Sequence, residues 1–253
     1  MNRGDETLVV PKDCVLWCHH QPYAETVLDD YAEVDLDKWN VRLAALRIPA
    51  RVFAVDADGR QIDSGIGHIR RGDLDASSTT LDLGSEPALN RLYLCDAWLR
   101  SHRDRGGFRR FLDVRDPHDR YHPFDMIARA LDSCEAEPAL VQTGAFRSWS
   151  GWPVAPGVGN SLMSLYSWAV HGAERDRPQL LDKYTAASMI RYGWMEDGGA
   201  SQYSVKTYAR YSGLIERWAG QAGTKPEIVE LWLNRDWHRR LGRHDRQEAL
   251  LLW

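Results

Sequence analysis

Apolar residues recur every three or four positions in most segments of this chain, a spacing that predicts amphipathic helices. In the N-terminal third, one such helix is expected over 35–46, with Asp35 placed to cap it. From residue 86 onward the helical pattern dominates, interrupted over 104–123 by a loop rich in glycine, proline and charge. The helices expected in this second part are 86–102, 124–134, 139–149, 202–220 and 226–241.

One stretch carries the pattern of paired strands instead. Residues 51–55 favour extended structure, 56–59 have the composition of a turn, and 61–65 can return as the second strand. The aspartates of the turn do not make an EF-hand, because one acidic position is missing, the glycine comes too early and no glutamate closes the loop. The sequence therefore predicts one small N-terminal β-hairpin in a mainly α protein.

The length of 253 residues allows one or two domains. The polar segment 72–85 is the best candidate for an internal boundary. We therefore expect a mixed helical and β-hairpin region over 1–85, not necessarily an independent domain, and a helical region over 86–253. With 43% hydrophobic and 27% charged residues the composition is globular, and no window has the apolar length of a membrane span. No secretory signal is legible, so we expect a cytoplasmic protein without a membrane partner.

Cysteines and histidines near the N-terminus raise the question of a metal site. Cys14, Cys18, His19 and His20 lie close together, but their spacing is poor for zinc and no second pair follows. We therefore expect buried cysteines beside Trp17 and no metal. Four cysteines in a chain of this length do not make a disulfide framework, so reduced thiols are expected. No cofactor is predicted.

The stretch most informative about function is Pro-Gly-Val-Gly at 156–159, followed by helix-compatible residues up to 172. Two glycines one residue apart permit a tight turn, and the unpaired N–H groups at the start of the next helix attract an anion. Asp182 then stands at the start of another apolar-periodic helix. This pattern predicts a phosphate seat followed by a functional carboxylate. The alternative is an ordinary turn between packed helices, with Asp182 as a plain N-cap.

These motifs resemble the helix-hairpin-helix DNA glycosylases of the 8-oxoguanine and adenine glycosylase superfamily, over about residues 124–195. The resemblance implies a helical glycosylase-like domain. In that family the hairpin grips one DNA phosphate, and an aspartate further along drives cleavage of the base from its sugar. Asp182 would be this catalytic carboxylate. The hairpin residues implied to bind the phosphate are Gly157, Val158, Gly159 and Ser161.

The chain departs from the family pattern at several positions. Ser161 stands where bifunctional members carry a lysine, so the resemblance implies a monofunctional enzyme that releases the base with water. The histidine often found after the family's aspartate is replaced, since Lys183 and Tyr184 follow Asp182. The four closely spaced cysteines of the iron–sulfur cluster in some members are absent.

The implied partner is double-stranded DNA carrying a damaged or modified base, which a monomer would flip out of the duplex. The net charge of −4 argues mildly against non-specific nucleic-acid binding, but basic runs at 100–110 and 237–244 could face a DNA backbone. Trp149 and Trp152 flank the hairpin and are candidates for stacking a flipped or orphaned base. The alternative for both runs is a solvated surface, and the alternative for both tryptophans is the core.

Two other functions fit the same residues. One is a helix-hairpin-helix DNA-binding protein without catalysis, and the other is a helical protein-interaction module, which the acidic net charge and the abundant aromatic residues favour. The identity of the base stays open at this point, as does the choice between repair and defence against modified foreign DNA.

Overall fold

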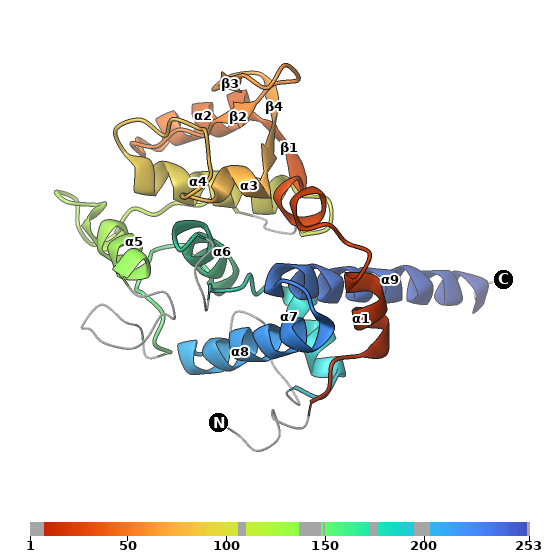
Figure 1. The fold of residues 1–253 in the computed structure, drawn as a ribbon. Coiled ribbons are helices and arrows are strands. Elements are labelled where there is room, and N and C mark those ends of the chain that lie inside the picture. Colours follow the sequence, from red (N-terminus) through yellow and green to blue (C-terminus); the bar gives the residue numbers. More distant parts are fainter. Residues whose placement is uncertain are drawn as a thin grey trace.

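Helices dominate the computed structural model of the chain, and a small sheet lies at one end (Figure 1). The predicted mainly α fold class is confirmed. The structure describes residues 8–105, 110–136, 148, 150–172, 177–194 and 203–251. After residue 242 it describes the backbone alone.

The N-terminal region contains short helices and a four-stranded antiparallel sheet with the strand order β1-β4-β2-β3. The elements are α1 (Lys12–Cys18), the π-helical turn η2 (Ala24–Leu28), β1 (Tyr31–Asp35), α2 (Leu36–Ala45), β2 (Ala54–Val55), β3 (Gln61–Ile62), β4 (Ile66–Arg70) and α3 (Arg71–Leu74).

Two local predictions are confirmed in this region. α2 fills the helix expected over 35–46, and the Asp35 side chain accepts the Lys38 N–H at 3.1 Å. This cap satisfies an N–H group that the first helical turn cannot pair itself, so the helix begins here. β2 and β3 pair as the expected hairpin, with Ala54 opposite Ile62.

The sheet also contains β1 and β4, which the sequence pattern did not predict. They pair with each other along their full length. In β4, a Cβ at Gly67 would lie only 2.7 Å from the Ala54 Cβ of β2. The glycine therefore permits a close approach of neighbouring strands, and it also removes an apolar side chain from the pattern by which a strand is recognised.

The remainder of the described chain is largely helical. Its helices confirm the predictions for 86–102, 124–134 and 202–220, while the helix predicted over 139–149 lies outside the described residues apart from Ser148. The helices are α4 (Pro87–Ser101), α5 (Asp125–Ala136), α6 (Asn160–Val170), α7 (Lys183–Arg191), α8 (Val205–Ala222) and α9 (Pro226–Leu251).

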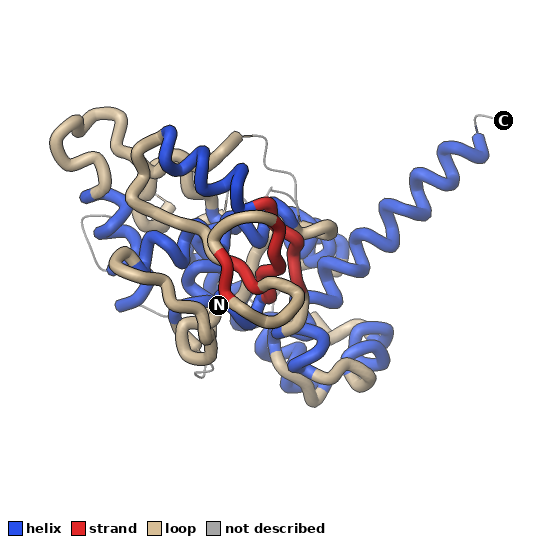
Figure 2. Tube along the Cα trace, turned by 90° about the horizontal axis from the view of Figure 1, so that it is seen from above, coloured by secondary structure: helices blue, strands red, loops and turns tan. Residues whose placement is uncertain are grey.

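The last helix, α9, is longer than the predicted segment 226–241, and its C-terminal half projects from the rest of the described chain (Figures 1 and 2). The residues after 241 are mostly good helix formers, and Gly242 alone does not end the helix. Local helix propensity therefore accounts for the extra length of α9.

α4 is central to the interior, because it packs against β1, β4, α5 and α6 and is buried along most of its length. α1 packs against α8 and α9, so the N-terminal segment of the described chain lies against its last two helices. Apolar side chains from Cys14 to Leu233 form one buried cluster. The division after residue 85 stays a prediction, and the regions on its two sides share this interior.

The cysteines of α1 are buried, as predicted. Cys14 and Cys18 lie one turn apart with their sulfur atoms 3.7 Å from each other, whereas His19 and His20 are exposed. The pKa of the Cys14 thiol is raised, mainly by the hydrogen bond to Cys18 and secondly by burial. No group of three His, Cys, Asp or Glu side chains within the described ranges is arranged to hold a metal ion. None of the helices in those ranges is both long and apolar enough to cross a membrane.

Candidate active site

The glycine hairpin forms a turn at the surface, immediately before α6. Gly157 has a φ of +71°, and the Val158 N–H donates to the Ala155 carbonyl at 3.3 Å. Gly159 is the N-cap of α6 and makes no side-chain capping bond. Gly157 and Gly159 are exposed, while Val158 and Ser161 are half-buried. The first turn of α6 therefore presents backbone N–H groups without a side-chain cap, which favours an anion.

The two glycines serve different purposes. A Cβ on Gly157 would lie 2.8 Å from the Asp113 carbonyl oxygen and 3.2 Å from the Leu112 side chain. A Cβ on Gly159 would have no heavy atom within 4 Å. Gly157 is thus required by the packing of the chain on itself, and Gly159 is the glycine that leaves the surface open.

We expect Gly157→Ala to lower the free energy of unfolding by about 2 kcal/mol, because it combines a left-handed φ with a backbone clash. Gly159→Ala is the matched control and should change stability far less. Thermal unfolding of both variants measures the difference. Equal melting temperatures would contradict the assigned roles.

A serine hydroxyl connects the hairpin side of α6 to the start of α7. Ser164 Oγ donates to the Ser161 carbonyl at 2.9 Å and accepts the Leu181 N–H at 3.0 Å. Residue 181 directly precedes Asp182. The predicted phosphate seat and the predicted carboxylate are therefore held in one fixed relation, although the sequence separates them.

Asp182 is the N-cap of α7 and is only 4% exposed. Its Oδ1 accepts hydrogen bonds from the Tyr184 N–H, the Thr185 N–H and the Thr185 hydroxyl at 2.9, 2.7 and 2.8 Å. Its Oδ2 accepts from Arg105 Nη1 at 2.7 Å and from Asn234 Nδ2 at 3.0 Å. One oxygen is thus fixed by its own helix, and the other by two side chains from distant parts of the chain.

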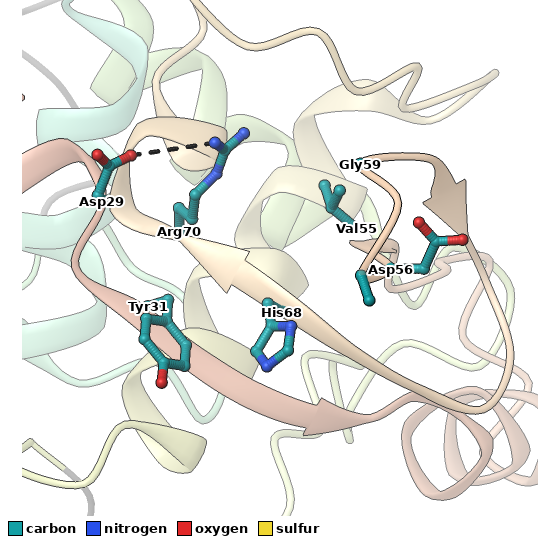
Figure 3. A pocket seen from close by; sticks show the side chains of 8 residues that line it. Asp29, Tyr31, Val55, Asp56, Gly59, His68 and Arg70 are labelled. Atoms are coloured by element: carbon teal, nitrogen blue, oxygen red, sulfur yellow. Dashed lines mark ion pairs between the residues drawn. The ribbon is translucent and has the colours of Figure 1, made fainter. Parts of the chain in front are cut away.

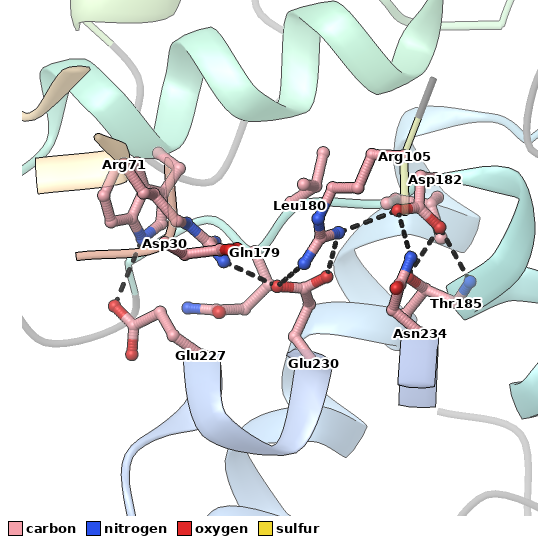
Figure 4. Close-up of polar contacts among 12 residues, drawn as sticks. Asp30, Arg71, Arg105, Gln179, Leu180, Asp182, Thr185, Glu227, Glu230 and Asn234 are labelled. Carbon is pink, nitrogen blue, oxygen red and sulfur yellow. Dashed lines mark hydrogen bonds and ion pairs between the residues drawn. The ribbon is translucent and has the colours of Figure 1, made fainter. Parts of the chain in front are cut away.

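Asp182 lies at one end of a chain of buried charges of alternating sign (Figure 4). Arg105 Nη1 also donates to Glu230 Oε1 at 2.6 Å, and Arg71 Nη1 donates to Glu230 Oε2 at 2.8 Å. The side chains of Arg71, Arg105 and Glu230 are fully buried. Burial alone would lower the pKa of Arg105, but Glu230 and then Asp182 raise it above the ordinary arginine value, so the guanidinium stays charged.

A model of the family described as "Putative 8-oxoguanine DNA glycosylase OGG-like protein" matches residues 25–234. The chain belongs to this OGG-like family. Searches of curated proteins and of solved structures found no match. The matched segment of the OGG-like chain contains the hairpin, Asp182 and all of its hydrogen-bond partners.

On the α9 side of the candidate site, Asn234 Nδ2 donates to the Asp104 carbonyl at 3.4 Å as well as to Asp182. His238 Nε2 donates to the same carbonyl at 2.6 Å, and its ring lies 4.3 Å from that of Tyr184. Asp104 also lines a cavity of about 600 Å³ whose wall includes Asp30, His102 and Arg235. The site therefore adjoins an open cavity through the backbone at residue 104.

A second cavity of the OGG-like chain lies over the outer face of the sheet and has a volume of about 470 Å³ (Figure 3). Tyr31 and His68, whose rings pack edge to face, line it together with Arg70 and Asp29, which form an ion pair. None of its lining residues belongs to the glycine hairpin at 156–159 or contacts Asp182.

Other residues singled out from the sequence lie apart from Asp182. Trp152 is 5% exposed, donates its indole N–H to the Tyr203 carbonyl and packs 5.0 Å from the Tyr208 ring. This is a core environment, and the base-stacking role of Trp152 stays a prediction. Trp149 lies outside the described residues.

The two basic runs do not form continuous basic surfaces in the described residues. In the first run Arg105 is buried in the charge chain. In the second, Arg239 and Arg240 pair with Asp236 at 3.3 and 2.7 Å. Lys183 is exposed, with its Nζ 4.6 Å from the centre of the Tyr184 ring.

Proposed function

We propose that this OGG-like protein is a monofunctional DNA glycosylase, which flips a damaged or modified base from duplex DNA and hydrolyses its N-glycosidic bond. Asp182 is the catalytic carboxylate in this proposal. The observation that carries it is the pair of hydrogen bonds made by the Ser164 hydroxyl, which link the first turn of α6 to the residue before Asp182. These bonds hold a turn suited to binding an anion in a fixed relation to a buried carboxylate. We also propose that the protein acts as a cytoplasmic monomer.

The hairpin would bind one phosphate beside the target nucleotide. Backbone N–H groups at the start of α6, with Gly157, Val158, Gly159 and Ser161 around them, can donate to phosphate oxygens without reading sequence. Such a contact fixes the strand while the base leaves the stack. The energy of the phosphate contact offsets part of the cost of unstacking.

Cleavage of the N-glycosidic bond builds positive charge on the sugar, and an ionised carboxylate nearby stabilises this charge or orients a water for attack. Of the two oxygens of Asp182, Oδ1 is fixed by bonds within α7. Oδ2 accepts from Arg105, which Glu230 holds in place, and from the amide of Asn234. Since Asp182 is buried in the free protein, the sugar reaches Oδ2 when the Asn234 contact gives way. The adjoining cavity at Asp104 is where the flipped base would lie.

The test is a panel of duplexes carrying 8-oxoguanine, uracil, alkylated bases or bulky modified cytosines of the phage type, scored for strand breaks after alkali. Base release from one of them is the expected result, and the base released separates repair from defence against modified foreign DNA. The second candidate function is DNA binding without catalysis, which the full occupation of both Asp182 oxygens favours. Binding of duplex DNA with no base release from any panel member would select that candidate.

Strand cleavage by the protein itself is not expected. An amine nucleophile would form a Schiff base with the opened sugar, which borohydride traps as a covalent adduct. Ser161 cannot do this, and the exposed Lys183 holds its Nζ over the Tyr184 ring. We therefore expect no adduct with the duplex that is cut. An adduct that disappears in Lys183→Ala would show instead that the amine has moved to position 183.

A further inference from the structure

The charge chain that ends at Asp182 begins in the N-terminal region. Arg71, the first residue of α3, contacts Glu230 of α9 across 159 positions of sequence. Glu230 holds both terminal nitrogens of Arg105, at 2.6 and 3.2 Å. Arg105 then donates to Asp182 Oδ2. Glu230 and Arg105 each lie between two charges of opposite sign, so the position of each depends on both of its neighbours in the series.

Stability alone is a poor explanation for this arrangement. Moving charges out of water costs free energy that a buried ion pair often fails to recover, and apolar side chains would fill the same space at lower cost. The hydrogen bonding within this series of charges is also incomplete. Three of its donors are buried without a hydrogen-bond partner: Arg71 Nε, Arg71 Nη2 and Arg105 Nε. Buried donors left in this way are unfavourable for folding. A requirement of the site accounts better for their presence.

The geometry indicates which requirement this is. Two bonds to Glu230 fix the plane of the Arg105 guanidinium, and its Nη1 is shared between Glu230 and Asp182. Arg71 in turn fixes Glu230 and is held over the Trp168 ring, 4.6 Å from its centre. The position of Asp182 Oδ2 is therefore set by a rigid series of contacts that starts on α3.

We propose that Arg105 is the positioning residue of Asp182, and that Glu230 and Arg71 hold Arg105 in place. This inference rests on the proposed glycosylase function. It makes α3, which lies within region 1–85, part of the catalytic unit, although no residue of that region touches Asp182 directly among the contacts of the described chain. Arg71 and Arg105 support the chemistry without contacting the substrate.

Arg71→Met, which removes the charge and keeps much of the length, is the first test. With the panel duplex that the unaltered protein cuts, single-turnover base release should fall about a hundredfold, as expected when a catalytic group is misplaced. The Kd for the same duplex should stay unchanged. Arg71→Lys should restore most of the rate, because an ammonium group can also pair with Glu230.

Arg177→Met is the matched control. Arg177 is also buried and lies over the same Trp168 ring, 3.7 Å from its centre, but it pairs with Asp75 and not with Glu230. This variant should lose stability and keep the rate of base release. Equal rate losses in Arg71→Met and Arg177→Met would overturn the proposal, as would a rate in Arg71→Met within threefold of the parent. If Arg71→Met does not fold, Glu230→Gln takes its place with the same expected results.

A second measurement needs no substrate. The Tm shifts of Arg71→Met, of Asp182→Asn and of the double variant form a cycle, and residues outside a shared network give shifts that add. We expect the shifts not to add, although Arg71 and Asp182 do not touch. Additive shifts would overturn the coupling. A panel in which the unaltered protein releases no base, combined with non-additive shifts, would remove the proposed function and leave the coupling through Arg105 intact.

Discussion

Asp182→Asn is expected to lower the rate of base release at least about a thousandfold. The reason is that it removes a negative charge which, in the unaltered protein, stabilises the transition state far more than the bound substrate. Duplex binding should stay the same or become tighter. The change is small in shape, since asparagine is also a good N-cap and its carbonyl oxygen can still accept the Tyr184 and Thr185 N–H groups. The amide nitrogen would instead face Arg105 and Asn234, which are both donors. The variant should therefore lose some stability as well as activity.

The control for that loss of stability is Asp236→Asn. Asp236 is another buried carboxylate between α7 and α9, 5% exposed, and it accepts from Ser188, Tyr192 and Arg240. The Asp236→Asn variant should lose stability in the same manner as Asp182→Asn but keep its rate of base release. Single-turnover rates of both variants, compared with their unfolding curves, separate the two effects. A rate for Asp182→Asn within about tenfold of the parent, equivalent to about 1.4 kcal/mol of barrier, would show that Asp182 is not the catalyst.

The hairpin and the N-cap could be predicted from the sequence because both are local. A left-handed turn selects glycine, as at Gly157, and the first turn of a helix selects a carboxylate, as at Asp182. The helices could be predicted for a similar reason, since buried and exposed positions alternate within each segment. These features depend on residues a few positions apart.

The partners of Asp182 could not be predicted in this way. Arg105 lies 77 positions from Asp182 in the sequence, and Asn234 lies 52 positions from it. Arg105 also lies in a run that has the composition of a solvated loop. The one available signal was Glu230, a charged residue inside the apolar stripe of a predicted helix, which calls for a buried partner. The sequence could not say that this partner would be an arginine already bound to Asp182.

Trp152 shows the limit of reasoning from proximity along the chain. It stands four positions before the hairpin, yet its indole N–H is bound to Tyr203 and its ring packs on Tyr208 of α8. The hairpin itself turns to the surface at Gly157 and Gly159. Residues only a few positions apart therefore lie in the core, as Trp152 does, or at the surface, as Gly157 does. The contacts of Trp152 with α8 place it in the core, and these contacts cannot be deduced from its position next to the hairpin.

Gly159→Val is expected to weaken binding to duplex DNA about tenfold to a hundredfold, which is the range for losing one hydrogen bond to a charged group. The reason is steric. Gly159 has an ordinary φ of −89° and open space where a Cβ would lie, so the fold accepts valine, but the branched side chain covers the N–H groups at the start of α6. Because a phosphate contact reads no sequence, the loss should be the same for lesion-bearing and unmodified duplexes.

Fluorescence anisotropy with both duplexes at one fixed salt concentration measures this effect, since affinity for DNA depends steeply on salt. Gly213→Val is the matched control, because Gly213 is also exposed and open, but lies on α8 away from the hairpin. At saturating DNA, Gly159→Val should keep the rate of base release, since Asp182 and its contacts are untouched. A variant that unfolds cooperatively and binds both duplexes with the parent's affinity would remove the phosphate seat from the hairpin and leave the role of Asp182 to its own test.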